Sequence, residues 1–508
     1  MKTTFATTCL IIAALFAGGA RCPGADAVNP FTPPNFPMPQ FPGRTFNLRD
    51  YGAKGDGKAN DTAAFNKAIA ACNKAGGGTV VVPAGQYLAA SVQVLSNVCI
   101  QLDKDATIIG GLAGAFLHPE PNPYDKYQDF GHSHFQNSLF WGENVENFAV
   151  LGGAIDGGVI ITGDPKKTPD VGDKIFAIKS GKNLRFDGTT FTKGAHFVYL
   201  LNDCENVTIA NSIIKKSRDA IDIMGCRNVQ IYNNDFTGCS DDTVGIKSDY
   251  ALGRRINSAN IYVWNCHLET GCNGIQFGSE TAGDFHNINV WDITIESAGK
   301  AALGITCNDS AIIDGVRMNN IKAKFASIPI YMLITDRLRT GEPGVKPGVI
   351  RNVVISNVTV DGCRPRKNNI IAPTTISGLP DHPLYNITLE NIKITMPGGG
   401  TAADAALENA VYTKHYSPRD MGVRPAAGLF ARHVRGLTLR NVIISYTAPD
   451  KRVPFAALDI DGLVLDNFNP GKTDWPSRLR LTNIKNMEIR ASEALPDGKT
   501  ASISKQNL

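Results

Sequence analysis

Residues 204–231 read CENVTIANSIIKKSRDAIDIMGCRNVQI, and this stretch decides the fold. It holds two copies of an Asn followed by alternating apolar and polar residues, Asn206–Ile209 and Asn228–Ile231, which lie 22 residues apart. Such alternation is typical of a β-strand with one buried face. Strands that recur at a spacing in the low twenties predict a solenoid, in which each coil stacks on the one before it.

Further copies of this repeat extend over most of the chain. They begin at Asn183, Asn260, Asn287, Asn352, Asn386 and Gly436. The later copies are more widely spaced, as expected where loops are inserted between strands. Because Leu recurs too irregularly for a leucine-rich repeat, we predict an all-β, single-stranded right-handed parallel β-helix. The repeated Asn side chains are expected to hydrogen-bond from coil to coil and to have no catalytic role.

The pattern also predicts the domain organisation. Residues 1–27 contain Lys2, the apolar core Leu10–Phe16 and the small residues Ala25–Ala27, which is typical of a cleavable signal peptide and predicts a secreted or periplasmic protein. A Pro-rich lead-in at 28–45 precedes one β-helix domain at 46–490, and residues 491–508 form a C-terminal tail. Residues 397–432 have a weaker pattern and are expected to be long loops.

A short helix is expected near the start of the fold. Phe65, Ala68, Ile69 and Cys72 have the spacing of one apolar helical face, and Asp61 is placed to act as the N-cap. We expect this helix, at residues 61–72, to cap the N-terminal end of the stack and to cover the open edge of its strands.

Composition argues against several classes of function. The formal net charge of the 508 residues is only +4, without a run of Lys or Arg, so no nucleic-acid partner is expected. No segment after the signal peptide is apolar over a length that would span a membrane. Of the 11 cysteines, Cys9 and Cys22 precede residue 28; the others are scattered, predicted to be mostly buried, and lack zinc-site spacing. We therefore expect neither a metal nor a cofactor.

One acidic patch stands out against this background. Residues 240–248 read SDDTVGIKS, and Asp219 and Asp222 precede Asp241 and Asp242 by about one repeat. If the coils stack in register, these carboxylates share one patch, and their proximity raises the pKa of at least one of them. Glycoside hydrolases need one carboxylic acid to protonate the leaving oxygen and another carboxylate to activate water or to attack. An exposed acidic turn or a calcium site would use the same residues.

Several segments resemble family 28 of the glycoside hydrolases, the polygalacturonase family. They are Asn47–Ala53, Gly76–Gly85, Asn147–Gly157, Cys204–Val207, Asp219–Asp222, Ser240–Ser248, Gly253–Arg255 and Gly278–Thr281. Their order and spacing follow the family from about residue 44 to residue 305. The resemblance implies a β-helix that hydrolyses a polysaccharide with inversion, with Asp241 as general acid and with Asp219 and Asp242 holding and deprotonating the attacking water. Inversion implies a gap of roughly 6.5–9.5 Å between the carboxyl groups.

Four more residues are candidates for contact with substrate. Asp222 lies one step from the catalytic acids and is expected to support them. Lys247 should face the solvent side beside the acids, where it tunes their pKa or touches substrate, unless it is a plain solvated Lys. Glu280 on the next coil is placed to accept a hydrogen bond from a sugar hydroxyl or to stabilise a turn. Asn273 occupies an aligned position where the family has a histidine.

Three departures from the family pattern concern substrate. Ser217–Arg218–Asp219 stands for Asn-Thr-Asp, Cys272–Asn273–Gly274 for Gly-His-Gly, and Gly304–Ile305–Thr306 for Arg-Ile-Lys. In the family, that Arg and Lys grip the carboxylate of galacturonate through charge-assisted hydrogen bonds. We therefore expect a neutral sugar, or a uronate polymer other than plain polygalacturonate, at the cleavage point. Arg218 is expected to pair with a neighbouring Asp or to supply a replacement charge.

The remaining histidines and tryptophans have weaker functional signals. His132, His134 and Gln136 are expected to lie in a loop near the cleft, and His196 to be structural. Trp264 and Trp291 are expected to stack between coils more than on sugar rings.

Two alternatives to a hydrolase remain at this point. One is a calcium-dependent polysaccharide lyase, in which the acids hold the ion. The other is a non-catalytic glycan-binding β-helix protein, which the missing His, Arg and Lys favour and the retained acids disfavour.

Overall fold

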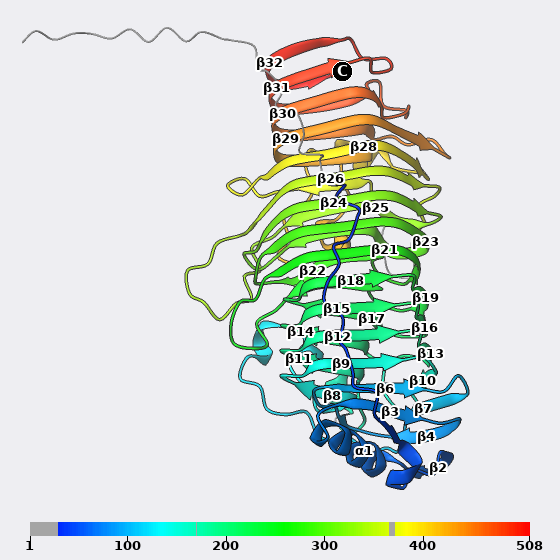
Figure 1. Cartoon of the computed structure of the whole chain (residues 1–508). Coiled ribbons are helices and arrows are strands. Elements are labelled where there is room, and N and C mark those ends of the chain that lie inside the picture. Colours follow the sequence, from blue (N-terminus) through cyan, green and yellow to red (C-terminus); the bar gives the residue numbers. More distant parts are fainter. Residues whose placement is uncertain (1–28, 169, 365–370) are drawn as a thin grey trace, which may run out of the picture.

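The computed structural model describes residues 29–168, 170–364 and 371–508, so the expected signal peptide lies outside the described residues. The described chain winds into an elongated stack of coils that runs from the N-terminal to the C-terminal end (Figure 1). Neighbouring coils pair in parallel along three ladders of strands, here named A, B and C in their order within a coil. The parallel β-helix predicted from the repeats is therefore the observed architecture.

Many strands, most of them in the first half of the chain, are short and belong to a single ladder. Ladder A consists of β1 (Thr45–Asn47), β3 (Gly78–Val82), β6 (Val98–Leu102), β9 (Glu146–Leu151), β12 (Lys182–Asp187), β15 (Glu205–Ala210) and β18 (Arg227–Tyr232). Ladder B consists of β2 (Asp56–Asn60), β4 (Gly85–Ala89), β7 (Ala106–Gly110), β10 (Ala154–Asp156), β13 (Thr190–Lys193), β16 (Ile213–Lys215) and β19 (Asp235–Cys239). Ladder C consists of β5 (Val92–Gln93), β8 (Ser138–Glu143), β11 (Lys174–Lys179), β14 (Phe197–Asn202), β17 (Asp219–Met224), β20 (Val244–Ser248), β22 (Ile275–Thr281), β25 (Ala326–Ile334) and β27 (Thr374–Ser377).

In the second half, long bent strands serve two ladders or more. These are β21 (Ser258–Thr270), β23 (Phe285–Cys307), β24 (Ile312–Ala323), β26 (Val349–Val360), β28 (Leu384–Met396), β29 (Ala426–Tyr446), β30 (Val453–Asn469) and β31 (Leu479–Arg490). For example, β21 pairs with both β18 and β19. The expected loops at 397–432 contain α2 (Ala402–Ala406) and the 3-10 turn η5 (Pro418–Met421), but β29 already begins at Ala426.

The core is built from strands in which apolar residues alternate with polar ones. Val207 and Ile209 of β15 lie directly beside Val229 and Ile231 of β18, and all four are at most 1% exposed. The Asn that precedes each pair is in the left-handed region, with φ 55° at Asn206. Its side chain donates to Asn183 Oδ1 (2.8 Å) and accepts from Asn228 Nδ2 (3.0 Å). The predicted ladder of amides is confirmed at these coils.

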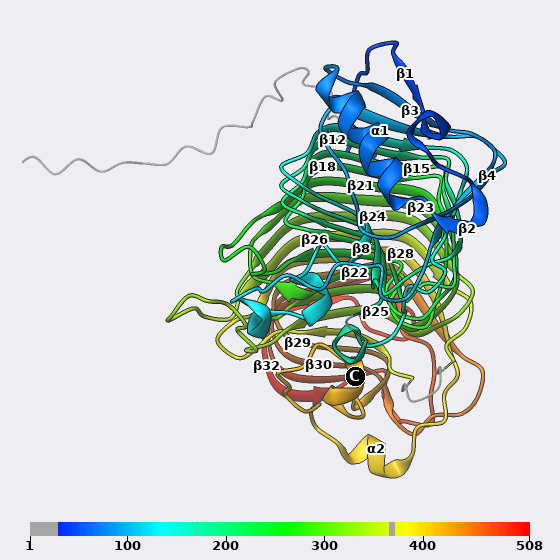
Figure 2. The same cartoon turned by 90° about the horizontal axis from the view of Figure 1, so that it is seen from below.

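The helix predicted at 61–72 is α1 (Thr62–Lys74), and it packs against β1, β3, β5 and β6 of the first coils at the N-terminal end of the stack (Figure 2). Asp61 does not cap it. The carboxylate of Asp61 instead accepts hydrogen bonds from the backbone N–H groups of Lys54 (2.7 Å) and Gly55 (3.1 Å), because the preceding turn brings those donors closer.

Both ends of the described chain pack against the stack. The lead-in runs along the outside of ladder A (Figure 1), where Phe31 meets the ring of Trp291 at 5.8 Å and the carbonyl of Pro34 accepts from Gln230. Trp264 and Trp291 stack on each other at 5.0 Å, as coil stacking predicts. The tail forms β32 (Gly498–Asn507), which pairs antiparallel with β31 and so covers the last open edge.

The cysteines and the helices also bear on the sequence expectations. The nine cysteines among the described residues are all buried and unpaired, as predicted for small apolar core residues. Within the described residues, no helix has the length and apolar character needed to cross a membrane.

The corner between ladders B and C carries the largest insertions. Residues 111–137, 157–173 and 397–425 all leave the stack there, including the 3-10 turns η2 (Asp125–Tyr127), η3 (Phe130–His132) and η4 (Pro165–Lys167); η1 (Leu48–Tyr51) lies in the first coil. Because successive coils are in register, these insertions gather over one side of ladder C.

Replacing Asn206 tests the amide ladder. Asn206→Ala removes two side-chain hydrogen bonds and places a Cβ-bearing residue without local hydrogen bonding at positive φ, whereas Asn206→Gly removes the bonds alone. We expect both variants to lower the free energy of unfolding, the Ala variant by about 1 kcal/mol more. Urea denaturation followed by circular dichroism measures the difference. Equal losses would show that the backbone conformation contributes nothing at this position.

Candidate active site

Three carboxylates meet at the corner between ladders B and C. Asp219 begins β17, and Asp241 and Asp242 precede β20 on the next coil. The parallel pairing of β17 with β20 brings the two corners together: the backbone N–H of Asp242 donates to Asp219 Oδ1 at 2.8 Å, and that of Ala220 donates to the Asp242 carbonyl at 3.1 Å. The expected meeting of these acids is therefore present in the structure.

Arg218 bridges the two coils through its guanidinium group. Nη1 donates to Asp219 Oδ2 (2.6 Å), and Nη2 lies 3.0 Å from Asp241 Oδ2. Nη1 also lies 2.9 Å from His196 Nε2, while His196 Nδ1 bonds the Gly163 carbonyl (2.6 Å). Burial, together with the charge of Arg218, lowers the pKa of His196 to about 2, so this neutral ring accepts from Arg218. The expectation that Arg218 pairs with a neighbouring Asp is confirmed, and His196 holds Arg218 in place.

The acids line a cavity of about 300 Å³. Its walls come from ladder C, from the 111–137 insertion, from the loop after β25 and from the 397–425 insertion. The lining residues are Asp129, Arg218, Asp219, Asp241, Asp242, Lys247, Ser279, Glu280, Arg337, Arg339, His415 and Tyr416. A cavity of this size with convergent polar groups is suited to a small polar ligand or to one part of a larger one.

The three acids differ in their environments. Burial raises the pKa of Asp242, and the neighbouring charge of Asp241 raises it further. Burial also raises the pKa of Asp219, with Arg218 opposing that rise. Burial raises the pKa of Asp241 too, but Arg218 and Lys300 outweigh burial and hold it below its usual value. The protonated form is therefore favoured more at the buried Asp242 and Asp219 than at Asp241, whose charge Arg218 and Lys300 stabilise.

Two of the four further candidates line the cavity. The side chain of Lys247 is 6% exposed and ion-pairs with Asp222 Oδ2 at 2.9 Å, so the solvated alternative for Lys247 is wrong. Burial opposes the charge of Lys247, but Asp222 and Asp219 outweigh burial and raise its pKa. Glu280 accepts from Arg339 Nη2 at 2.5 Å. Burial raises the pKa of Glu280, but His132 and Arg339 lower it more, so Glu280 is ionised.

The other two candidates, Asp222 and Asn273, lie behind the residues that line the cavity. Asp222 is fully buried beneath Lys247, and Asn273 is 2% exposed. Asn273 donates from Nδ2 to Asp242 Oδ1 at 3.0 Å and accepts from the backbone N–H of Ala301 at 3.0 Å. Because both bonds of Asn273 to Asp242 end on Oδ1, they are compatible with a proton on Oδ2. Asp222 and Asn273 are thus placed to position Lys247 and Asp242.

A buried histidine adds to this support. His132 is 1% exposed, and its Nε2 lies 3.4 Å from Asp222 Oδ2. Its Nδ1 lies 3.8 Å from Glu280 Oε2 and 3.9 Å from Asp249 Oδ2. The expected loop position near the cleft is confirmed for His132, which lies under the cavity wall.

The structure also shows what replaces the missing Arg-Ile-Lys motif. A Cβ at Gly304 would lie 2.2 Å from Gln276 Oε1, so Gln276 fills the space that a side chain at 304 would need. Gln276 is held by Nε2 bonds to the Phe277 carbonyl (2.6 Å) and Thr306 Oγ1 (3.1 Å). Positive charges reach the cavity from other elements instead, through Arg218, Arg337 and Arg339.

Sequence reasoning missed the residues contributed by loops. Asp129, Arg337, Arg339, His415 and Tyr416 line the cavity, yet none lies in the repeat or in a segment that resembles the family. Their positions depend on how insertions fold back over ladder C, and no periodic signal reports that.

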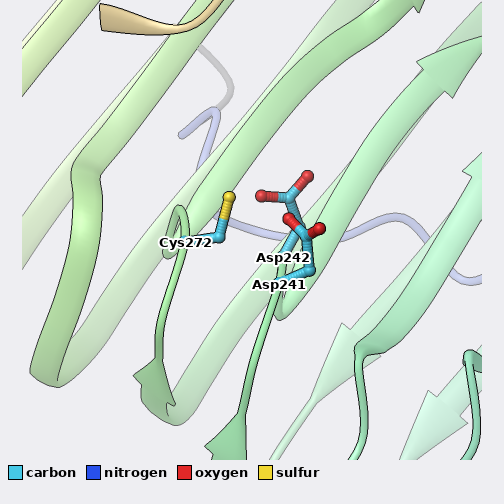
Figure 3. A group of neighbouring side chains, drawn as sticks. All are labelled: Asp241, Asp242 and Cys272. Carbon is cyan, nitrogen blue, oxygen red and sulfur yellow. The ribbon is translucent and has the colours of Figure 1, made fainter. Parts of the chain in front are cut away.

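One group of ligand atoms has the spacing of a metal site. Oxygens of Asp241 and Asp242 and the Sγ of Cys272 lie within 4.8 Å of one another (Figure 3). The donor set is unsuited to calcium, which takes oxygen ligands. Burial and the charges of Asp242 and Asp241 raise the pKa of Cys272, so its thiol stays protonated. These residues do not favour the calcium-dependent alternative.

The carboxylates of Asp241 and Asp242 also lie close to each other, with an oxygen of each within 4.8 Å of an oxygen of the other. Because the two residues are adjacent in the chain and both face the same cavity, the backbone keeps their carboxylates close.

A parallel β-helix that brings three carboxylates together beside a cavity has the groups that cleavage of a glycosidic bond requires. A family model with the description "Glycosyl hydrolases family 28" matches residues 72–414. The chain therefore belongs to this family. It is a glycoside hydrolase of the polygalacturonase-like kind, and the family supports activity on a pectin-like polysaccharide.

Known proteins agree with this assignment. Polygalacturonase from Prunus persica is 25% identical over 375 residues, which are 69% of this chain and 86% of that protein. The family 28 exopolygalacturonase of Yersinia enterocolitica superposes with a TM-score of 0.60 at 16% identity, covering 84% of this chain and 79% of its own. The exopolygalacturonase of Thermotoga maritima superposes with a TM-score of 0.58 at 20% identity, and the match covers 81% of this chain and 94% of that one. The two structures support the β-helix fold.

Removing the charge of Asp222 tests the support beneath the cavity. Asp222→Asn leaves the buried ammonium of Lys247 without its closest carboxylate, so we expect the free energy of unfolding to fall by about 3–5 kcal/mol. The matched control is Glu296→Gln, which breaks an exposed ion pair with Lys324 and should cost less than about 1 kcal/mol. Urea denaturation compares the two. Similar small losses would show that Lys247 does not depend on Asp222.

Proposed function

We propose that this protein hydrolyses glycosidic bonds of a pectin-like glycan at the cluster of Asp219, Asp241 and Asp242. The observation that carries the proposal is the division of charge within the cluster: Arg218 keeps Asp241 ionised, while burial favours the proton on Asp242. A hydrolase needs one carboxylic acid and one carboxylate in reach of the same bond, and this cluster supplies both.

The proposed steps follow from that division. Asp242 gives its proton to the glycosidic oxygen as the bond to the anomeric carbon breaks. A water molecule attacks the anomeric carbon, and its proton passes to Asp241. After the products leave, solvent returns the proton from Asp241 to Asp242. Asn273 holds Asp242 throughout, and Arg218 holds both Asp219 and Asp241. These roles reverse those that the sequence resemblance implies for Asp241 and Asp242.

Attack by water in one step inverts the anomeric configuration, as the family resemblance implies. The other outcome, in which Asp241 attacks the anomeric carbon directly, would retain the configuration. Proton NMR of the first product formed separates the two, since the anomers differ in their coupling constants.

The substrate proposed here is neutral at the cleavage point. Each cation of the cavity wall has a carboxylate partner within the protein: Arg218 has Asp219 and Asp241, Lys247 has Asp222, Arg337 has Asp309, and Arg339 has Glu280. A substrate carboxylate would have to displace one of these partners. Plain polygalacturonate is therefore disfavoured, in line with the altered motif at Gly304–Thr306.

Export completes the proposal. The sequence pattern of residues 1–27 supports a cleavable signal peptide and a secreted or periplasmic location, where a polymeric glycan is accessible.

The pH dependence of Arg218→Gln tests the roles. Activity that needs Asp241 ionised is lost as pH falls through the pKa of Asp241. Because Arg218 lowers that pKa, its removal raises the pKa, and we expect the acid limb of kcat/KM to move to higher pH. Arg254→Gln, on an exposed residue paired with Asp203, is the control and should leave the profile unchanged. A shift of the alkaline limb alone would make Asp241 the proton donor.

A matched pair of substrates tests the charge preference. Polygalacturonate and its methyl ester share one backbone and differ in charge. We expect the ester to be cleaved with the higher kcat/KM, because its carboxyl groups do not compete with the carboxylate partners of the wall arginines. Release of reducing ends measures both, within a panel that also includes rhamnogalacturonan and xylogalacturonan. Faster cleavage of the free acid than of every neutral or branched member would contradict the proposal.

A further inference from the structure

The outer face of ladder C is largely covered, and every residue of β14, β17, β20, β25 and β27 is buried. Toward the C-terminal end, a second apolar core covers it. Its members are Ala301, Ile328, Tyr331, Leu333, Ala372, Ala410, Met421, Ala426, Phe430, Val453 and Ala456. Ala410 and Met421 belong to the 397–425 insertion, whereas Ala301, Ile328, Tyr331 and Leu333 belong to β23 and β25. The insertion therefore lies packed on the face along which a long polymer would otherwise continue.

Hydrogen bonds hold the 397–425 insertion against the stack. The buried guanidinium of Arg432 donates to Asn409 Oδ1 (2.9 Å) and to the Ala410 carbonyl (2.6 Å), and it lies 3.8 Å from the centre of the Tyr412 ring. Nearer the acids, Lys300 Nζ donates to the hydroxyl of Tyr416 at 2.9 Å. Because Tyr416 also lines the catalytic cavity, the insertion forms the wall of the cavity on this side.

We call the packed 397–425 insertion the first seal of ladder C. A second seal, the Phe135 seal, covers ladder C toward the N-terminal end. Phe135 of the 111–137 insertion packs with Ala177, Phe197, Leu200 and Met224 of ladder C in a separate apolar cluster. The carboxylate of Glu120 fastens this segment by accepting from the backbone N–H groups of Phe135 (2.8 Å) and Gln136 (3.1 Å). The coils below the acids are thus also covered.

A neighbouring cavity of about 510 Å³ adjoins the catalytic cavity. The two share Asp129 and Arg218, and the neighbouring cavity reaches the exposed residues 162–164 and Lys166. It lies beside the Phe135 seal, where Gln128, Phe130 and His196 also line it. A substrate chain that leaves the catalytic cavity past Arg218 would enter this neighbouring cavity.

We propose that the protein removes units from the ends of glycan chains. The terminal unit occupies the cavity between the two seals, and the rest of the chain leaves past Arg218 through the neighbouring cavity. A long polymer bound in mid-chain would need an exit at both ends of the cavity, and the packed insertions occupy the path along ladder C in both directions. This inference rests on the proposed hydrolase function.

Product analysis on the panel member that is hydrolysed fastest tests the inference. We expect the terminal unit, or one short oligosaccharide of fixed length, as the sole early product, and slow loss of viscosity relative to the release of reducing ends. Oligosaccharides of the same glycan, labelled at the reducing end, should shorten by that same unit step by step. Early mixtures of many lengths with rapid loss of viscosity would overturn the inference while leaving the hydrolase function intact. Failure to hydrolyse any member of the panel would overturn both.

A pair of variants tests the wall itself. Tyr416→Ala removes the side chain that closes the cavity toward Lys300, and we expect KM for short labelled oligosaccharides to rise about tenfold with loss of the single-step product pattern. Val423→Ala, on an exposed side chain of the same insertion, should change neither. Circular dichroism and the midpoint of thermal unfolding confirm that both variants are folded. An unchanged pattern and KM in Tyr416→Ala would contradict the role of the insertion.

Discussion

The parallel pairing of neighbouring coils at the corner between ladders B and C is the constraint on which the site depends. Asp219 and Asp242 are 23 residues apart in the chain, yet the backbone N–H of one donates to the carboxylate of the other. That bond exists because β17 and β20 are in register. A slip of one residue would exchange inward and outward side chains and would disperse the acids.

Bringing carboxylates together in a buried corner is costly unless their charge is compensated. The protein compensates with Arg218, which joins two coils, and with Lys247, which reaches Asp222 beneath the cavity. In the proposed mechanism, this uneven compensation supplies one acid and one carboxylate. Arg218 keeps Asp241 ionised, whereas Asp242 is buried beside a negative charge and keeps a proton more readily. The same compensation gives each cation of the wall a carboxylate partner within the protein.

Sequence and structure agree best where the repeat is regular. The alternation in Asn206–Ile209 and Asn228–Ile231 predicts strands whose apolar residues stack, and Val207 and Val229 do so. The acids at 219, 241 and 242 were placed from the length of one repeat, and that placement is correct. Errors concentrate where local patterns compete with tertiary contacts. The Asp61 side chain bonds an adjacent turn and does not cap the helix, and Lys247 is buried in an ion pair with Asp222.

The sequence by itself determined the coil, its register and which acids meet, because a period of about one coil relates each position to the one stacked on it. Only the tertiary structure decided the shape and charge of the cavity. Asp129, Arg339 and Tyr416 reach it from insertions that obey no period, and each is placed by contacts with ladder C that form after the chain has folded back. Local periodicity specifies neighbours along the stack, whereas the packing of long loops depends on surfaces that exist only once the stack is built.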